Sequence, residues 1–422
     1  MIYGIFSTIA FILILPFWLV LGIFKPKLVY GFREKMGLFA TPILKKAKTI
    51  VFYGVSVGEV IAIENLIRKT RETHPEINIV LLTGTKTGQE IAHKKLGDIC
   101  DFISYFPFDF PFSIENMLNK IKPDAVFVAE TELWPNFANI TKKYKIPLYI
   151  INGRISDRTF KSYKKLSFFF APILKNYTNI FTQSKQDKEK LISIGANPQT
   201  TTIMGNLKFD IKKPDLSTLC FEKNPEHKIL IAGSTHSGED EIILETFCEL
   251  RKEIPNLKLI IAPRHPERNE NVFELIKKTG IDCNKRSEQI KNDETSCPLS
   301  LMPSCLLLDT MGELGKFYSI CYVAFIGGSF NKTGGHNPLE ATIFNKPTVS
   351  GPSTHNFKDI YAILTSSGAG KIVKTKEELK AHLHKLFTDE IFYQKSAQDC
   401  ENVFEENKGA LKFVMDVLQS IV

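Results

Sequence analysis

Hydrophobic residues along this chain follow three successive patterns. An uncharged run from Ile2 to Phe24 comes first, and it matches the roughly 20 residues that cross a bilayer core. Short apolar runs of strand length then alternate with amphipathic stretches of helical period. From Lys376 to Val422 the period is helical throughout. The chain therefore predicts a membrane segment, an α/β region and a helical end.

The run from Ile2 to Phe24 predicts an uncleaved membrane anchor, residues 1–25. It lacks the basic start and the small-residue cleavage site of a secretory signal peptide. Basic residues follow it at once, so the positive-inside rule predicts that the rest of the chain is cytoplasmic. These residues are Lys25, Lys27, Arg33 and Lys35. Pro16 and the lack of a polar face leave open a helix that dips into the membrane without crossing it.

The alternating region predicts two α/β, Rossmann-like domains with parallel sheets. The first spans residues 30–210 and the second 228–400, with a polar, proline-containing linker at 211–227. We expect the last helix, 401–422, to pack back toward the N-terminal domain. Ligands bind at the carboxyl ends of such strands, so a cleft between the two sheets is the predicted ligand site. The predicted strands are Thr49–Tyr53, Ile77–Thr83, Phe102–Phe106, Ala125–Ala129, Leu148–Asn152, Asn179–Thr182, Lys228–Ala232, Leu257–Ala262, Cys305–Asp309, Tyr322–Ile326 and Pro347–Ser350.

Charge and cysteine content limit the partners. The 54 Lys and Arg residues against 46 Asp and Glu give a formal charge of +8, which suits an anionic membrane surface or phosphorylated substrates. No block of five or more like charges and no basic stripe with interleaved aromatics is present, so nucleic acid is not an expected partner. The cysteines form no CxxC pair, which predicts reduced thiols without disulfides or structural zinc.

The segment Val55-Ser56-Val57-Gly58-Glu59 follows the first predicted strand and leads into a helix that we expect to begin near Val60. Gly58 lets a ligand approach the backbone. Glu59 has two open interpretations. It is either a carboxylate that offsets the helix dipole or a general base whose partial burial raises its pKa toward working pH.

Other strand ends of the first domain also carry charged residues. In the run from Glu130 to Asn136, ETELWPN, we expect one of the acids to contact a ligand while the other caps the next helix. Arg154 either meets an anion or pairs with an acid such as Glu130. Lys208 either reaches across the cleft or remains a solvated surface lysine.

The second domain carries small residues and arginines at its strand ends. The run AGSTHSG at 232–238 offers backbone N–H groups to a phosphate, and the acids at 239–241 fit a helix start better than a metal site. Arg264 can clamp a phosphate or carboxylate, whereas Arg268 fits a structural pair with an acid. The segment DTMGEL at 309–314 follows a further strand and opens a helix.

The densest signal is the two double glycines at 327–328 and 334–335. The short loop between them and the helix after them predict a turn that binds an anion, in which Asn337 and Glu340 can form hydrogen bonds with a ribose or a base. The chain has no GxGxxG, Walker A, HExxH or D-x-D sequence for other cofactor or metal chemistry. A metal-independent transfer from a nucleotide sugar remains, in which one carboxylate deprotonates the attacking hydroxyl.

Taken in order, these motifs resemble those of the Kdo (3-deoxy-D-manno-octulosonic acid) transferases, which build the inner core of lipopolysaccharide in Gram-negative bacteria. The match runs nearly from end to end and includes the N-terminal anchor. Its motifs are SVGE at 56–59, ETELWPN at 130–136, NGRIS at 152–156, GNLKFD at 205–210, AGSTH at 232–236, APRHPER at 262–268, DTMGEL at 309–314 and GGHNPLE at 334–340.

The resemblance implies a GT-B fold and transfer of Kdo from CMP-Kdo to the lipid A precursor, lipid IVA, with inversion and with neither metal nor cofactor. It implies that Glu59 is the catalytic base and that Glu130 and Lys208 assist the transition state. It also implies an inner-membrane enzyme with its catalytic domains on the cytoplasmic side. The substrate-binding residues that it implies are Pro263, Arg264, Met311, Gly312, Glu313, Gly335, Asn337, Pro338, Leu339 and Glu340.

The sequence departs from the family at two places. Tyr53-Gly54-Val55 replaces the usual His-Ala-Ala before SVGE, which puts acceptor contacts in doubt, and the loop at 330–333 is unusual. Two rival functions remain. A nucleotide-sugar epimerase of the same fold would need no anchor, and a binding protein that has lost catalysis would be expected to lack Glu59 or Lys208.

Overall fold

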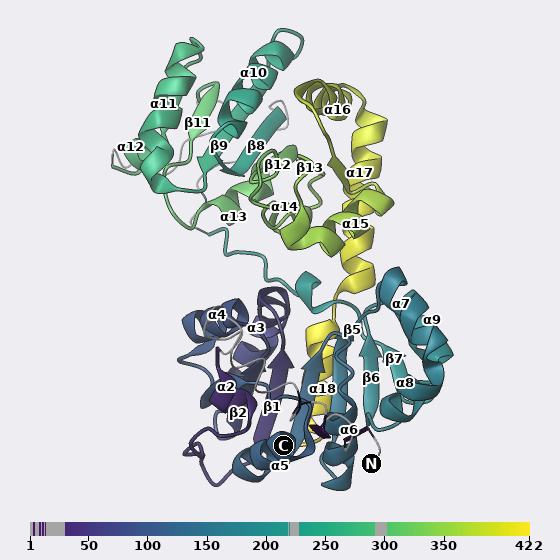
Figure 1. The fold of residues 1–422 in the computed structure, drawn as a ribbon. Helices are drawn as coiled ribbons and strands as arrows, with labels where there is room; N and C mark the ends of the chain where they lie inside the picture. Colours follow the sequence, from purple (N-terminus) through teal and green to yellow (C-terminus); the bar gives the residue numbers. More distant parts are fainter. Residues whose placement is uncertain are drawn as a thin grey trace. The chain divides into compact units, whose positions relative to one another are not determined.

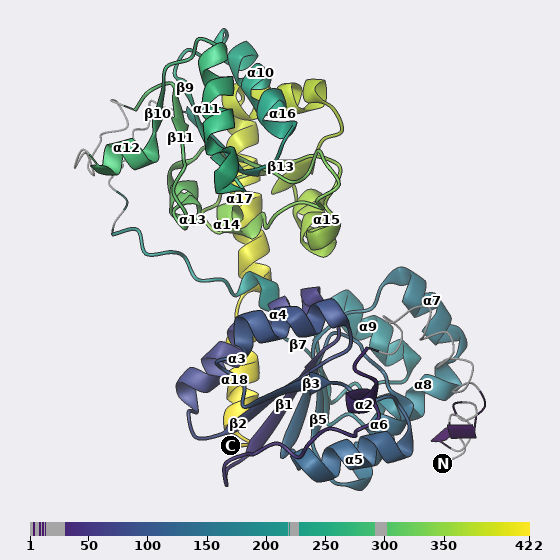
Figure 2. The ribbon, with the colours of Figure 1, turned by 60° about the vertical axis from the view of Figure 1, so that its left-hand side comes forward.

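Two parallel β-sheets organise the chain, one in each of its two structural units (Figure 1). The computed structural model describes residues 30–217, 219, 228–291 and 302–422, together with Tyr3, Gly4, Thr8, Ile9, Phe11 and Leu13. The first unit comprises residues 1–210 and 407–422, and the second comprises residues 211–406. Helices cover both faces of each sheet, which confirms the prediction of two Rossmann-like α/β domains (Figure 2).

The sheet of the first unit has the strand order β3-β2-β1-β4-β5-β6-β7, and every pair in it is parallel. The order reverses between β1 and β4, so the chain leaves these two neighbouring strands toward opposite sides. The strands are β1 (Thr49–Gly54), β2 (Asn78–Thr83), β3 (Phe102–Tyr105), β4 (Ala125–Ala129), β5 (Leu148–Gly153), β6 (Asn179–Thr182) and β7 (Thr201–Ile203).

The strands β1, β2, β4 and β5 are buried along their whole length, which explains their nearly continuous apolar sequences. In β1, Ile50 and Phe52 face a core that α3, α4 and α18 complete. Val51 and Tyr53 face the opposite core, which α5, α6, α8 and α9 complete. The helices of this unit are α2 (Phe32–Lys35), α3 (Val57–Thr73), α4 (Lys86–Leu96), α5 (Pro111–Ile121), α6 (Pro135–Lys143), α7 (Asp157–Lys165), α8 (Ser167–Leu174), α9 (Lys185–Ile194), η2 (Leu207–Phe209) and α18 (Ala410–Gln419).

The C-terminal helix α18 belongs to the first unit although the second unit precedes it in sequence. Its residues Val414 and Leu418 are fully buried in the core beside β1. The Asp210 carboxylate accepts hydrogen bonds from the N–H groups of Gly409 (2.9 Å) and Leu411 (2.6 Å) at the start of the helix. The last residue before the second unit therefore caps the first helix after it.

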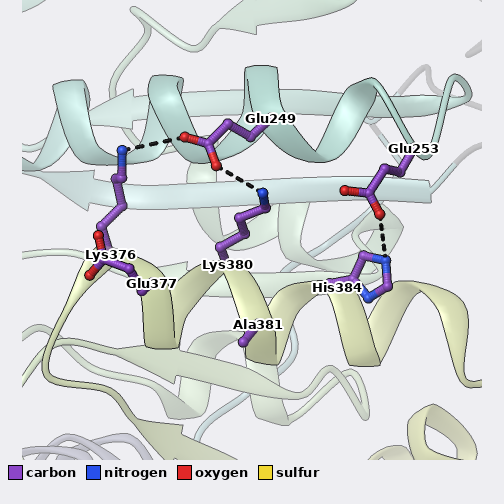
Figure 3. Close-up of a pocket in the computed structure, with 7 residues that line it drawn as sticks. All are labelled: Glu249, Glu253, Lys376, Glu377, Lys380, Ala381 and His384. Carbon is purple, nitrogen blue, oxygen red and sulfur yellow. Dashed lines mark hydrogen bonds and ion pairs between the residues drawn. The ribbon is translucent and has the colours of Figure 1, made fainter.

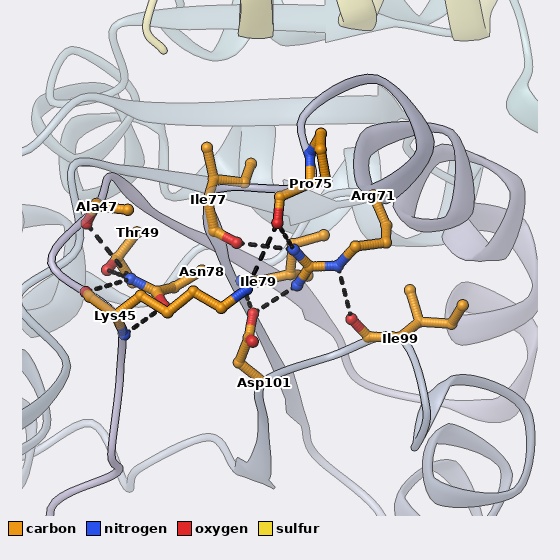
Figure 4. A network of polar contacts seen from close by, with 10 residues as sticks. All are labelled: Lys45, Ala47, Thr49, Arg71, Pro75, Ile77, Asn78, Ile79, Ile99 and Asp101. Atoms are coloured by element: carbon orange, nitrogen blue, oxygen red, sulfur yellow. Dashed lines mark hydrogen bonds and ion pairs between the residues drawn. The ribbon is translucent and has the colours of Figure 1, made fainter.

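A single arginine fixes the amino ends of β2 and β3 (Figure 4). Arg71, near the end of α3, donates to the carbonyl oxygens of Pro75 (3.0 Å), Ile77 (2.8 Å) and Ile99 (3.1 Å). It also donates to Asp101 Oδ2 (2.5 Å), which accepts the N–H of Ile79 as well. The end of α3, the start of β2 and the approach to β3 thus share one guanidinium, which fits several acceptors at once.

The second unit has a similar sheet with the order β10-β11-β9-β8-β12-β13-β14, again parallel throughout. It differs from the first in that β11 lies between β9 and the edge strand β10. Here the order reverses between β8 and β12. The strands are β8 (Lys228–Thr235), β9 (Leu257–Pro263), β10 (Cys283–Lys285), β11 (Cys305–Leu307), β12 (Val323–Ile326), β13 (Thr348–Ser350) and β14 (Gly370–Ile372). The helices are α10 (Glu239–Arg251), η3 (Pro266–Arg268), α11 (Asn269–Lys278), α12 (Arg286–Lys291), α13 (Leu314–Phe317), η5 (Tyr318–Ile320), α14 (Leu339–Thr342), η6 (His355–Phe357), α15 (Lys358–Ser367), α16 (Lys376–Thr388) and α17 (Glu390–Asn407).

A row of ion pairs aligns α16 along α10 (Figure 3). Glu249 contacts both Lys376 (3.4 Å) and Lys380 (2.9 Å), and Glu253 Oε2 lies 3.0 Å from His384 Nε2. Partners recur every fourth residue on both helices, so the two rows match. Because these side chains are partly exposed, the pairs set the register of the helices and add little stability.

The predicted anchor at Ile2 to Phe24 lies mostly outside the described residues. Within the part of the chain that the structure describes, no helix is both long enough and apolar enough to span a bilayer.

Candidate functional site

Glu59, Glu130 and Lys208 meet where the strand order of the first unit reverses. Glu59 follows β1, Glu130 directly follows β4, and Lys208 lies in η2 after β7. The Lys208 Nζ is 3.9 Å from Glu130 Oε1. Burial lowers the pKa of Lys208, and the carboxylates of Glu130 and Glu59 oppose this shift. The structure therefore places the three predicted catalytic residues within electrostatic reach of one another.

Glu59 makes helix-start contacts in addition to facing this cluster. The helix α3 begins at Val57, earlier than the predicted start near Val60, because Ser56 takes the N-cap position. Glu59 accepts hydrogen bonds from the N–H of Val55 (2.6 Å) and from the hydroxyl of Ser56 (3.0 Å). The two roles left open for Glu59 are thus compatible, since the helix-start contacts also fix the carboxylate in place.

The pKa of Glu59 is raised to about 7. Burial is the main cause, and the bond from Val55 opposes it. Glu130 and Glu132 add like-charge repulsion, while the bond from Ser56 lowers the pKa. A carboxylate with a pKa near working pH is suited to accept a proton from a hydroxyl group and to release it again.

Strained backbone at the ends of β4 and β5 positions the other two groups. Glu130 has φ +58° and Asn152 has φ +54°, a left-handed conformation that residues other than glycine rarely adopt. Glu130 N–H nevertheless continues the sheet by donating to Ile151 O (2.9 Å). The buried Asn152 accepts the N–H of Leu207 through Oδ1 (3.0 Å), which holds η2 and its Lys208 against β5. Such strain persists only where surrounding contacts enforce it.

Arg154 and Glu132 complete the charged cluster. Arg154 lies close enough to Lys208 to lower its pKa, and burial raises the pKa of Glu132. The Thr131 hydroxyl donates to Arg154 O (2.6 Å) and accepts from Arg154 N–H (3.1 Å), so the loops after β4 and β5 are joined. Acids and bases at one sheet edge can move a proton and bind an anionic substrate.

The raised pKa of Glu59 makes a testable statement about stability. Its value is about 7 in the folded chain against an ordinary value of 4.5, so the folded state binds an extra proton between these pH values. The unfolding free energy of the parent chain therefore falls as pH rises through this window. Glu59→Gln cannot titrate. Its unfolding free energy relative to the parent should grow by about 1 to 3 kcal/mol between about pH 5 and pH 8 in chemical denaturation. A difference that stays constant over this range would contradict the raised pKa.

In the second unit, the equivalent position holds a fully buried carboxylate, Glu239. Its oxygens accept the N–H groups of His236 (2.9 Å), Gly328 (2.7 Å), Ser329 (2.8 Å) and Phe330 (2.8 Å). The prediction that these backbone groups cradle a ligand anion is therefore wrong for these four N–H groups, because the chain supplies the anion itself. Glu239 instead joins the loops after β8 and β12.

Replacing Glu239 tests this internal anion. In Glu239→Gln, an amide NH₂ group would face several N–H donors, and we expect the unfolding free energy to fall by about 3 kcal/mol. Glu241→Gln is the matched control, since Glu241 lies in the same first turn of α10 and is exposed, and its effect should stay within about 0.5 kcal/mol. Chemical denaturation followed by circular dichroism measures both. Equal effects of the two substitutions would refute the structural role.

Arg264 and Arg268 have different roles, as the sequence suggests. Arg268 is paired with the buried carboxylate of Asp240 and donates to Thr235 O (3.0 Å), so it is structural. Arg264 is exposed directly after β9 and interacts electrostatically with Glu340 and His336. Arg264 is therefore the arginine available to a ligand.

The remaining predicted substrate residues follow β9, β11 and β12 at the same edge of the second sheet. They differ in how exposed they are and in how far other residues already hold them. Met311 is 70% exposed, and Gly312 has φ +84° with open space around it. Glu313 is bound by the buried Arg286 (3.3 Å). Pro263 is half-buried, and Gly335 has a left-handed backbone with φ +75°. Asn337 Oδ1 accepts the N–H of Leu339 (3.1 Å). The side chains of Pro338 and Leu339 are buried. At Pro338 and Leu339, only backbone atoms can reach a ligand.

Three histidines at this edge were not singled out from the sequence. The Nε2 atoms of His236 and His336 are 2.9 Å apart, and the ring of His265 stands edge-on to His236 at 5.2 Å. Burial and the neighbouring histidines and arginine lower the pKa of His336 to about 4. The available signal was that three strand-end motifs, GSTH, PRH and GGH, each end in histidine.

Comparison with known proteins identifies the family. Residues 30–211 match the family model for 3-deoxy-D-manno-octulosonic-acid transferase. The chain is 34% identical to the 3-deoxy-D-manno-octulosonic acid transferase of Haemophilus influenzae over 96% of its length and 95% of that protein.

Two solved structures share the fold. One is the UDP-GlcNAc 2-epimerase of Neisseria meningitidis (TM-score 0.53, 16% identity, 88% of this chain and 100% of that one). The other is the glycosyltransferase of kitacinnamycin (TM-score 0.51, 11% identity, 90% of this chain and 100% of that one). At such identities these likenesses support the GT-B-like architecture alone. By its similarity to the Haemophilus enzyme, the chain belongs to the 3-deoxy-D-manno-octulosonic acid (Kdo) transferases, a family of glycosyltransferases.

Proposed function

We propose that this Kdo transferase uses CMP-Kdo as donor and the lipid A precursor, lipid IVA, as acceptor, with inversion and without a metal ion. The observation that carries the proposal is the Glu59 carboxylate, whose pKa is about 7 beside Glu130 and Lys208. In the reaction, Glu59 takes the proton of an acceptor hydroxyl. The hydroxyl oxygen bonds to the anomeric carbon of Kdo from the face opposite the phosphate, and CMP leaves with the electron pair of the broken bond.

The charges of the donor support a metal-free mechanism. CMP-Kdo bears one phosphate and one carboxylate, and fixed cations can stabilise the charge that develops on the leaving phosphate. Arg264 and Lys208 are the cations proposed for this role, and Glu130 positions Lys208 through their 3.9 Å contact. The residues proposed to hold the cytidine nucleotide are Pro263, Arg264, Met311, Gly312, Glu313, Gly335, Asn337, Pro338, Leu339 and Glu340.

The proposed location is the inner membrane, with the two units on its cytoplasmic side. The uncharged run from Ile2 to Phe24 and the basic residues after it support a single-pass anchor. An enzyme held in this way stays near an acceptor that is itself a membrane lipid.

A direct assay tests donor, acceptor and metal independence together. The purified chain is incubated with CMP-Kdo and lipid IVA, with and without EDTA, and the lipid is analysed by mass spectrometry. We expect the mass of one or more Kdo units to be added at the same rate in both samples, because cationic side chains take the place of a metal ion in stabilising the leaving phosphate. The absence of any adduct contradicts the substrates, and an adduct that is lost with EDTA contradicts the metal-free mechanism.

Substitutions assign the roles within the site. Glu59→Gln should lower kcat at least about 100-fold while CMP still binds, because the base is lost and the fold retained. Lys208→Gln should lower kcat/KM about 100-fold, since it removes a cation from the transition state. Lys212→Gln is a control at an exposed lysine nearby in sequence and should change kcat/KM less than about twofold. Full activity of Glu59→Gln would refute its role as base.

A further inference from the structure

The loop between β11 and α13, residues 309–313, is held at both of its ends by residues of other elements. Two of these residues begin α12, the helix that follows the edge strand β10 (Figure 2). The loop contains Met311, Gly312 and Glu313, three of the residues proposed to hold the cytidine nucleotide. The contacts that shape this loop therefore bear on donor binding.

The first attachment holds the Asp309 carboxylate. Ser287, the second residue of α12, donates to it through its N–H (2.8 Å to Oδ1) and through its hydroxyl (2.5 Å to Oδ2). The Asn269 side-chain amide, at the start of α11, donates to Asp309 O (3.2 Å). Both the side chain and the backbone of the first loop residue are thus fixed.

The second attachment holds the Glu313 carboxylate. The buried Arg286 donates to both of its oxygens, from Nη2 to Oε1 (3.3 Å) and from Nε to Oε2 (3.4 Å). The Thr310 hydroxyl also donates to Oε2. The guanidinium carbon lies 5.8 Å from the centre of the buried Phe317 ring. This geometry suits arginine and not lysine, because it uses a forked donor with a flat face.

The tip of the loop lies between these two attachments. Met311 and Gly312 are exposed there, and Gly312 has a left-handed backbone with φ +84° and open space around it. A loop that is fixed at both ends needs little further ordering when a ligand binds at its tip, which lowers the entropic cost of binding.

We propose that Arg286 and Ser287 are positioning residues for the donor. By holding Glu313 and Asp309, they keep the tip of the loop in the conformation that receives the cytidine nucleotide. The inference rests on the proposed function, in which this loop binds the nucleotide. It adds two residues of α12 that act through the loop and need not touch the donor themselves.

Binding and turnover of the full-length chain test this role. Arg286→Gln should raise the Kd for CMP, measured by calorimetry, and the KM for CMP-Kdo about tenfold each, because the loop must then be ordered on binding. The kcat at saturating donor should change less than about twofold, since Glu59, Glu130 and Lys208 are unaltered. Arg286→Lys keeps the charge without the fork and should still bind CMP about fivefold more weakly than the parent. Ser287→Ala removes one hydroxyl contact and should weaken CMP binding about threefold.

Arg251→Gln is the matched control. Arg251 Nη1 lies 3.9 Å from Asp282 Oδ1, and Asp282 also accepts the N–H of Ser304 at the amino end of β11, opposite to the loop. Its loss should change the Kd for CMP less than about twofold. Hydrogen exchange of the ligand-free chain gives a readout that needs no substrate. The amides of residues 309–313 should exchange at least about tenfold faster in Arg286→Gln than in the parent or in Arg251→Gln.

The outcomes separate this role from the proposed function. A parent chain that binds no CMP would overturn the proposed donor and the positioning role with it. If the parent binds CMP but Arg286→Gln and Ser287→Ala bind it equally well, or if exchange of the loop is unchanged, the positioning role alone is wrong. A lower melting temperature and kcat at constant Kd would assign Arg286 to the fold alone and overturn the role as well. Ser287→Ala, which removes a single contact, decides the question if Arg286→Gln does not fold.

Discussion

The candidate site depends on the reversal of strand order between β1 and β4. Helix α3 leaves β1 toward one face of the sheet and α6 leaves β4 toward the other, so no connection covers the carboxyl ends of these strands. Glu59 and Glu130 consequently stand beside each other, partly removed from water. Burial and like charge both favour the protonated form of Glu59, and the hydrogen bonds from Val55 and Ser56 limit the shift to a pKa of about 7. Topology thus sets the acid–base property of one side chain.

The second unit uses the same topological position differently. Glu239 opens α10 after β8, as Glu59 lies in the first turn of α3 after β1. Glu239 has four backbone N–H donors and no exposed surface, whereas Glu59 has two donors and remains partly exposed. The first arrangement holds two loops together, and the second leaves a carboxylate able to exchange a proton. Because Glu239 occupies the N–H groups of the glycine-rich turn, an anionic ligand of this unit would depend on side chains such as Arg264.

The sequence predicted the regular strands well and missed features that depend on distant contacts. Ala125–Ala129 and Asn179–Thr182 were predicted with their observed bounds, because polar or proline-containing segments flank each apolar run. The strands β7, β10 and β14 were missed, because their sequences, TTI, CNK and GKI, contain no apolar run. The hydrogen bond from Ser329 N–H to the Glu239 carboxylate joins residues 90 positions apart, and the three histidines come from separate strand ends. No local pattern could indicate either, whereas Glu59 and Lys208 were recognisable because each lies in a motif.

The site contains locally unfavourable conformations and charges, which the two hydrophobic cores of the first unit make possible. Glu130 and Asn152 have left-handed backbones, and Glu59 is a carboxylate in a position that raises its pKa. Each of these features lowers stability. Buried neighbours enforce the two backbones, since Glu130 N–H donates to Ile151 O and the Asn152 side chain accepts the N–H of Leu207. The strands beneath are buried on both faces, so the rigid part of the first unit does not depend on its charged edge. A functional edge can be strained in this way because the apolar layers, and not the charged residues, carry the stability of the fold.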